Sequence, residues 1–318
     1  MLARAAAPPD AAAGPKMLWG DDSRLGRPFA KDPSVIRFGG RYLLYYSVPG
    51  AGGDSGGMSG WGIGIAESRN LTDWRKVGEL ASDRPYEGKG VAAPCARVIA
   101  SEVHLFYQTY GNMAHDAICH AVSKDGLRFV KDAENPVFHP VGAWSAGRAI
   151  DAEVVPFQGK WFLYAATRDP QMKVQMITGA VAESGKGFGR DAWKMTSDGP
   201  LLKPELPWEK DCIEAPSVVQ RGDSLVMFYA GAYNNAPQQI GVARSKDGVH
   251  WERLSKEPFL PVGKPGSWNS SESGHPGAFV DDDGQTYLFY QGNPDKGKTW
   301  LLSYVRVGWH GDVPYLMD

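Results

Sequence analysis

The sequence predicts an all-β fold, a five-bladed β-propeller with four antiparallel strands in each blade, and three observations lead to this prediction. Short apolar segments with aromatic centres alternate with turns along most of the 318 residues, and almost no segment has helical periodicity. One two-strand pattern recurs five times at intervals of about 60 residues. A second two-strand pattern follows it in each of the first four repeats. A closed propeller accounts for all three observations, whereas a β-sandwich does not explain a repeat of this length.

Each repeat begins with a short polar or proline-containing entry, followed by an apolar strand, a turn and a strand with an aromatic centre. In the first, DPSVIRFGGRYLLYYS, a Gly39-Gly40 turn joins the two strands. The others are APCARVIASEVHLFYQTYG, DAEVVPFQGKWFLYAATRD, EAPSVVQRGDSLVMFYAG and HPGAFVDDDGQTYLFYQGN. We expect the first residues of the five stretches to occupy equivalent positions, namely Asp32, Ala93, Asp151, Glu214 and His275.

The second pattern predicts the third and fourth strands of a blade. Stretches such as ICHAVSKDGLRFVKD and IGVARSKDGVHWERL are typical of a strand, a tight Asp-Gly turn and a strand that carries Trp or Phe. The last repeat ends in WLLSYVRVGWH, which predicts a third strand and leaves a fourth open. We expect the N-terminal segment around KMLWGDD to complete this blade, because an added strand there would remove an open sheet edge.

The chain is expected to form one domain after a short leader. Residues 1–16 are rich in alanine and proline and predict a disordered leader or linker, and residues 17–318 a single propeller domain. The leader could be the end of a trimmed signal peptide, which would suit a secreted or periplasmic protein. A cytoplasmic location stays open.

Composition limits the classes of partner. The formal net charge is −2, which favours neither nucleic acid nor an anionic membrane surface as a partner, and no apolar run is long enough to span a bilayer. Cys95, Cys119 and Cys212 lie far apart and form neither a metal-binding pair nor a disulfide framework. No organic cofactor is predicted, and the oligomeric state is left open.

The acidic entries predict a catalytic cluster. The first strand of each blade lines the central channel of a propeller, so Asp32, Asp151 and Glu214 should ring one funnel together with His275. Carboxylates held close together repel one another, and at least one of their pKa values should rise. This arrangement is typical of sites that need an acid and a base together.

These entries resemble those of glycoside hydrolase family 43. The resemblance rests on KDPSVI, IDAEVV and IEAPSVV, with AAPCARV in the second blade, and covers most of the chain. Relatives in the propeller families 32/68 and 117 are not excluded. The resemblance implies that Asp32 is the general base, that Asp151 orients the acid and tunes its pKa, and that Glu214 is the general acid. It also implies an axial metal ion near His275, commonly calcium held largely through water.

Other residues depart from the family pattern or extend the site. Ala92 stands where the family has tryptophan, and Cys95 where aspartate is common. Glu153 follows the blade-three aspartate by two residues and should face the same side of the strand, which makes it a candidate for substrate binding. Arg168, in a TRDP stretch, could bind a sugar hydroxyl, although a simple turn is the alternative. Trp268 is a candidate platform for a sugar ring.

A glycine-rich loop contains GDSGG at residues 53–57. This stretch matches the nucleophile motif of trypsin-like proteases, but no matching His and Asp elements accompany it. We interpret it as a chance match in a loop that could cover the funnel mouth as a mobile flap.

The sequence therefore predicts an inverting glycoside hydrolase. The expected reaction removes a terminal pentose, α-L-arabinofuranosyl or β-xylosyl, from oligosaccharides. The alternatives are a propeller glycosidase of another specificity, such as a fructosidase, galactosidase or anhydrogalactosidase, and a carbohydrate-binding propeller without catalysis. The sugar and its linkage are left open.

Overall fold

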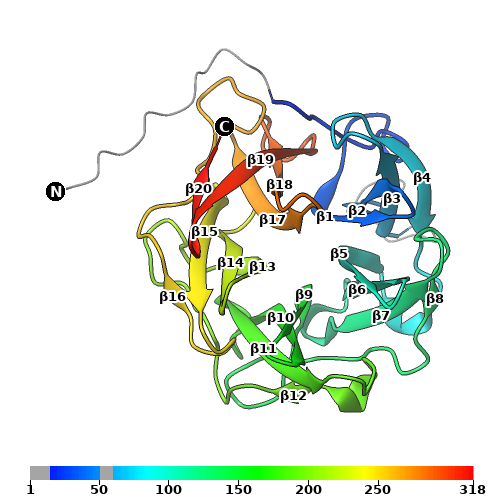
Figure 1. Cartoon of the computed structure of the whole chain (residues 1–318), viewed down its shortest axis with the longest axis vertical. Coiled ribbons are helices and arrows are strands. Elements are labelled where there is room, and N and C mark those ends of the chain that lie inside the picture. The colour runs from blue at the N-terminus through cyan, green and yellow to red at the C-terminus, as the bar shows by residue number, and fades with distance from the viewer. Residues whose placement is uncertain (1–14, 51–59, 318) are drawn as a thin grey trace.

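The computed structural model describes residues 15–50 and 60–317, which form a five-bladed propeller with the blades arranged in a ring (Figure 1). Each of the five sheets contains four antiparallel strands in chain order, so the predicted fold class is confirmed. Most of the expected leader and the GDSGG loop lie outside the described residues. The helices of the described part are three 3₁₀ turns, and no helix there is long and apolar enough to cross a membrane.

The strands are as follows. Blade one contains β1 (Lys31–Phe38), β2 (Arg41–Val48), β3 (Gly62–Ser68) and β4 (Arg75–Leu80). Blade two contains β5 (Gly90–Ile99), β6 (Glu102–Tyr110), β7 (Ile118–Ser123) and β8 (Val130–Lys131). Blade three contains β9 (Ile150–Phe157), β10 (Lys160–Arg168), β11 (Gln175–Glu183) and β12 (Lys194–Met195). Blade four contains β13 (Ile213–Arg221), β14 (Ser224–Gly231), β15 (Gln239–Ser245) and β16 (Glu252–Arg253). Blade five contains β17 (Glu272–Val280), β18 (Thr286–Asn293), β19 (Leu301–His310) and β20 (Val313–Leu316).

The hydrophobic core is divided into layers between neighbouring blades. Successive side chains of a strand point to opposite faces, and both faces of β2 are covered. Leu43 and Tyr45 pack with residues of blade two, whereas Leu44 and Tyr46 pack with residues of blade five. This burial on both faces explains the continuous apolar and aromatic run in the second strand of each repeat.

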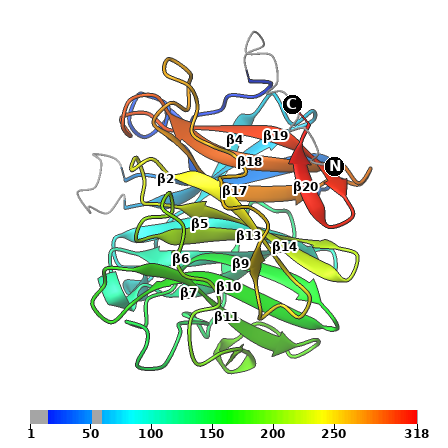
Figure 2. The same cartoon turned by 90° about the vertical axis from the view of Figure 1, so that its left-hand side faces the viewer.

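Both ends of the chain contribute to blade five. Its fourth strand is β20, which pairs with the last residues of β19 (Figure 2). The N-terminal segment pairs elsewhere on the same strand, where Trp19 and Leu302 exchange two backbone hydrogen bonds of 2.9 and 2.7 Å. The N-terminal segment therefore supplements the fourth strand of this blade and does not replace it, which corrects the expectation from the sequence.

A bulge near the start of each inner strand sets the position of the site residues. In every blade one residue at the bulge has a positive φ, in the range of 42 to 55°, and these residues are Asp32, Ala93, Asp151, Ala215 and His275. Such a conformation costs about 1–3 kcal/mol outside glycine and is typical of functional sites. Glu214 therefore lies one residue before the expected position, equivalent to Lys31 and Ala92, which corrects the alignment made from the sequence.

A second ring of contacts ties the inner strands together. In four of the five blades, the side chain two residues after the bulge position accepts a hydrogen bond from a backbone N–H of the next blade. The contacts are Ala96 N to Ser34 Oγ at 2.9 Å, Val154 N to Cys95 Sγ at 3.4 Å, Val218 N to Glu153 Oε1 at 2.9 Å and Ala278 N to Ser217 Oγ at 2.8 Å. The equivalent residue of blade five is Gly277, where a Cβ atom would lie 2.0 Å from Pro33 O. Cys95 and Glu153 are thus members of an interblade ring.

Candidate active site

A cavity of about 470 Å³ lies at the end of the channel where the inner strands begin. Asp32, Asp151, Glu214 and His275 all line it, so the structure brings together the four residues that the sequence predicted to converge. They come from four different blades, and all four side chains are largely buried. A smaller cavity of about 40 Å³ is lined by Asp32, Asp151 and His275 together with residues of the interblade ring, among them Glu153.

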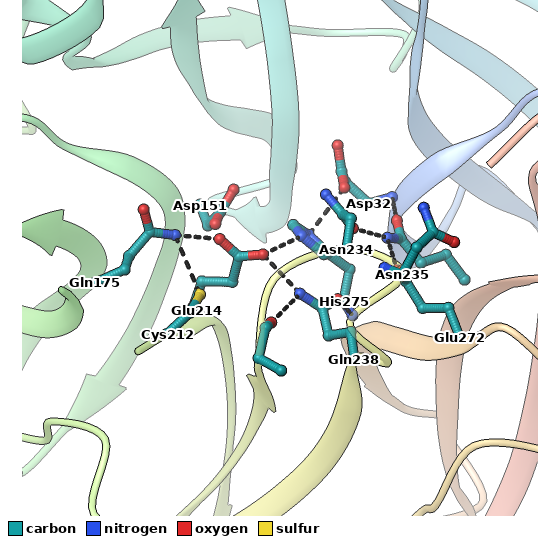
Figure 3. Close-up of polar contacts among 12 residues, drawn as sticks. Asp32, Asp151, Gln175, Cys212, Glu214, Asn234, Asn235, Gln238, Glu272 and His275 are labelled. Atoms are coloured by element: carbon teal, nitrogen blue, oxygen red, sulfur yellow. Dashed lines mark hydrogen bonds and ion pairs between the residues drawn. The ribbon is translucent and has the colours of Figure 1, made fainter. Parts of the chain in front are cut away.

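His275 lies between two of the carboxylates (Figure 3). Its Nδ1 is 2.8 Å from Asp32 Oδ1, and its Nε2 is 3.1 Å from Glu214 Oε1. Burial alone would lower the pKa of His275, but the charges of Asp32 and Asp151 and the contacts with Asp32 and Glu214 raise it well above its ordinary value. Burial opposes ionisation of Asp32 as well, yet the charges of His275 and Lys31 hold the pKa of Asp32 well below its usual range.

Glu214 accepts three hydrogen bonds from side chains. Gln238 Nε2 donates to Oε1 over 2.6 Å, His275 Nε2 donates to the same oxygen, and Gln175 Nε2 donates to Oε2 (Figure 3). Burial would raise the pKa of Glu214, but the hydrogen bonds from His275 and Gln238 outweigh it and lower the pKa. The carboxylate form of Glu214 is therefore the stabilised one.

Asp151 is the member of the cluster whose carboxyl pKa is raised. Its Oδ2 is buried without a hydrogen-bond partner among the described residues. Burial, together with the charges of Glu214 and Asp32, raises the pKa of Asp151 to about 7. One donor atom each of Asp151, Glu214 and His275 lie within 4.8 Å of one another, so the two acids form a coupled pair. The raised pKa thus falls on Asp151, whereas the sequence led us to expect it on Glu214.

The three proposed substrate-binding residues have different places. Arg168 lines the cavity, and its Nε donates to Gln175 Oε1 over 2.8 Å. Glu153 does not line this cavity, because its carboxylate is bound by Arg97 and belongs to the interblade ring. Trp268 packs on Tyr290, with 5.3 Å between ring centroids, in the core between blades four and five. The expectations for Glu153 and Trp268 are therefore corrected, since neither residue faces the cavity.

Residues at the entry of the third strands were missed in the sequence. Gln175 and Gln238 are equivalent, because the next-but-one residues Ile177 and Ile240 form the same isolated bridges. The same position holds Trp61 and Trp300 in blades one and five, and both line the cavity. Aligning the third strands would have revealed this ring. Other aromatic residues on the cavity wall are Phe29, Tyr110 and Tyr233.

The expected calcium site does not fit the arrangement of His275. A metal-binding imidazole must offer a nitrogen lone pair, but both ring nitrogens of His275 already contact carboxylate oxygens. Calcium also prefers six to eight oxygen ligands, whereas Asp32 and Glu214 direct oxygens to the imidazole. The raised pKa of His275 favours a protonated imidazole between the two carboxylates.

Comparison with known proteins agrees with this geometry. The curated β-1,2-mannobiose phosphorylase of Thermoanaerobacter sp. (strain X514) is 25% identical over 132 residues, which are 37% of this chain and 42% of that protein. The structure of a thermostable family-43 glycoside hydrolase has a TM-score of 0.73 and 23% identity, covering 91% of this chain and 93% of the other. The α-L-arabinanase of Cellvibrio cellulosa has a TM-score of 0.70 and 17% identity, covering 91% and 96%. The sequence matches the family described as glycosyl hydrolases family 43 over residues 25–305, so the chain belongs to this family of glycoside hydrolases.

Proposed function

We propose that this protein is an inverting glycoside hydrolase that removes terminal pentose units, α-L-arabinofuranosyl or β-xylosyl, from oligosaccharides. The observation that carries the proposal is the placement of Asp32 and Glu214 on opposite nitrogens of His275, at one end of a single cavity. An imidazole ring and contacts of 2.8 and 3.1 Å separate the two carboxylates. This spacing supports inversion, because inverting enzymes place their two carboxyl groups about 6.5–9.5 Å apart to admit a water molecule.

The proposed reaction assigns one proton transfer to each side of the sugar. Asp32 is ionised and accepts a proton from the water that attacks the anomeric carbon. Glu214 donates a proton to the glycosidic oxygen as the bond to the leaving group breaks. In the resting protein the proton of the coupled pair lies on Asp151, so transfer from Asp151 to Glu214 prepares the acid. His275 keeps the two flanking carboxylates in place.

The choice of a pentose is supported only by the kinds of protein that share the fold. The similar structures include an α-L-arabinofuranosidase from Lactobacillus brevis, with a TM-score of 0.68 and 18% identity. Another is described as an endo-1,4-β-xylanase from Bacteroides thetaiotaomicron, with a TM-score of 0.71 and 19% identity. These names define the first substrates to test.

The experiment is a panel of nitrophenyl glycosides that includes α-L-arabinofuranoside and β-D-xyloside, with the first product anomer identified by proton NMR. We expect one of these two pentosides to be cleaved with inversion. Asp32→Asn should lower turnover by about 10²–10⁴-fold, even with a good leaving group, because the water loses its base. Retention of configuration, or turnover by Asp32→Asn near that of the wild type, would contradict the mechanism. Cleavage of only hexosides would contradict the pentose assignment.

A further inference from the structure

Two arginines of blade three share one neutral acceptor beside Glu214. Arg148 Nη1 is 3.3 Å from Gln175 Oε1, and Arg168 Nε is 2.8 Å from the same oxygen. The two guanidinium groups are therefore neighbours on the cavity wall. The amide nitrogen of Gln175 donates to Glu214 (Figure 3). Because both arginines contact the oxygen of the same amide, they lie on the side of the cavity where the proposed acid acts.

The positive charge of this pair is only weakly compensated. Among the described residues, Arg168 makes no ion pair with a carboxylate, and its other contacts are Met172 O at 3.2 Å and the Tyr233 ring at 5.3 Å. Arg148 approaches the carboxylate of Asp116 at 3.5 Å, and its charge also acts on Asp151. Burial raises the pKa of Asp116, which weakens that partner. A guanidinium group cannot relieve the imbalance by losing its proton.

Two other cations, Lys31 and Arg27, line the cavity, and each has a different environment from the two arginines. Lys31 lies near several carboxylates, with Asp32 and Glu272 the strongest influences, and it sits over the Trp300 ring at 4.6 Å. The exposed Arg27 donates to the backbone oxygen of Lys298 over 2.6 Å. Solvent screens the exposed Arg27. Arg168, with Arg148 beside it, is therefore the half-buried cation of the cavity that lacks a carboxylate partner among the described residues.

We propose that Arg148 and Arg168 form a subsite for an oxyanion, either a carboxylate or sulfate substituent of the sugar that leaves beside Glu214 or a free phosphate ion. The placement beside the leaving group rests on the function proposed above. Paired guanidinium groups match the planar, two-oxygen geometry of these anions and bind them more strongly than neutral hydroxyls. Phosphate is included because the Thermoanaerobacter relative is a phosphorylase.

A purely positioning role makes a different prediction. If the arginines only hold Gln175 against Glu214, their removal should affect acidic and neutral ligands equally. An oxyanion subsite should lose its preference for the acidic ligand and keep its affinity for the neutral one. The comparison of matched ligands therefore separates the two roles.

The test is calorimetric titration of the purified full chain with D-galacturonate, D-glucuronate and orthophosphate, each compared with D-galactose and D-glucose. We expect at least one anion to bind about 10- to 100-fold more tightly than the neutral sugars. Arg148→Gln and Arg168→Gln should abolish this preference. Arg128→Gln, which removes a charge from a side chain that is 92% exposed, should not. Arg168→Lys replaces Arg168→Gln if the latter does not fold, and it should weaken the preference because lysine lacks the planar fork.

The outcomes assign or overturn the subsite. Tighter binding of a uronate than of phosphate assigns a sugar substituent, and the reverse assigns a free phosphate. Equal affinity for all three anions and for the neutral sugars overturns the proposal. It is also overturned if the arginine variants lose affinity for the anions and for the neutral sugars to the same extent. The titration needs no turnover and can be repeated in Asp32→Asn. A protein that prefers anions but hydrolyses no glycoside would therefore contradict the proposed function and not the subsite.

Discussion

Buried charges occur in two regions of this protein, and their surroundings differ. Away from the centre, blades one, two and four each contain a trio of a buried acid, a tyrosine of the second strand and a cation of the fourth strand. The trios are Asp21–Tyr46–Lys76, Glu87–Tyr107–Lys131 and Glu209–Tyr229–Arg253. At the centre, three acids from three blades surround one histidine.

The outer trios are fully compensated. Glu209 has an unexposed side chain and accepts hydrogen bonds from Tyr229 at 2.7 Å, from Arg253 at 2.8 Å and from the backbone N–H of Glu205 at 2.8 Å. Burial opposes its ionisation, but these bonds lower the pKa of Glu209. In such a pair each buried charge has its partner, and removal of one partner would leave the other charge buried and uncompensated.

The central cluster is not compensated in this way. Three acids surround His275, with Lys31 as the other nearby cation. Asp151 Oδ2 has no hydrogen-bond partner among the described residues, and the pKa of Asp151 is raised to about 7. Such imbalance is unfavourable for folding and typical of groups that move protons. Buried charged groups alone therefore do not identify a functional site. Buried charged groups that lack balancing partners do.

The largest effect is expected at Glu214. Glu214→Gln should lower turnover by about 10²–10⁴-fold on glycosides with poor leaving groups, because an amide cannot protonate the departing oxygen. The loss should be much smaller on dinitrophenyl glycosides, whose leaving group needs no proton. Rates on the two substrate classes measure the difference. An equal loss on both would move the role of acid to Asp151.

A substitution in an outer trio should affect stability and not chemistry. Glu209→Gln removes the buried carboxylate partner of Arg253 and leaves it only the exposed Glu205, at 3.0 Å. We therefore expect the free energy of unfolding to fall by about 3–5 kcal/mol. Denaturant unfolding measures this loss, and the turnover of the folded fraction should stay unchanged. Glu183→Gln is the matched control, because the exposed pair of Glu183 and Lys160 at 3.2 Å should contribute at most about 1 kcal/mol. A similar loss in both variants would remove the distinction between the two regions.

The two regions should also respond to pH with opposite signs. Asp151 binds its proton more tightly in the folded state than in the unfolded state, so the wild type loses stability as pH rises from about 4 to about 7. Its neighbours His275, Glu214, Asp32 and Arg148 set this pKa together with burial. Asp151→Asn should therefore gain stability over the wild type as pH rises through this window.

Glu209 provides the opposite sign as a control. Its pKa is lowered on folding, so its contribution is present above the ordinary glutamate pKa and is lost as pH falls below it. The stability difference between wild type and Glu209→Gln should therefore shrink in acid. Urea unfolding at several pH values measures both trends. A stability difference for Asp151→Asn that is independent of pH would mean that Asp151 is already ionised in the folded protein.

Much of this arrangement was predictable because the fold is a repeat. The period of about 60 residues and the two-strand patterns predicted the five blades, and the polar entries predicted that Asp32, Asp151 and His275 converge. The position of Glu214 was predicted one residue out of register. A proline follows the bulge residue in four blades, for example Pro33 and Pro216, and aligning the repeats on these prolines would have given the correct register.

Other features depend on contacts between blades that no single repeat contains. The lowered pKa of Glu214 comes chiefly from His275 of blade five, with Gln238 of its own blade adding to it, and its carboxylate also accepts from Gln175 of blade three. Glu153 is two residues from Asp151 on the same strand, as the sequence indicated. Its carboxylate, however, binds Arg97 of blade two and the backbone N–H of Val218 of blade four, so it connects blades. Trp268 could not be distinguished from a surface aromatic because its partner Tyr290 belongs to the core between two blades.

The smallest effect is expected from removal of metal ions. The resemblance to the family led us to expect calcium near His275, but each ring nitrogen of His275 contacts a carboxylate oxygen, at 2.8 and 3.1 Å. A metal ion bound there would have to displace Asp32 or Glu214, which are the proposed base and acid. We therefore expect prolonged chelation, checked by elemental analysis, to leave the melting temperature and the turnover unchanged. A loss of activity that added calcium restores would show that the central cation is a metal ion and that the imidazolium bridge forms only in its absence.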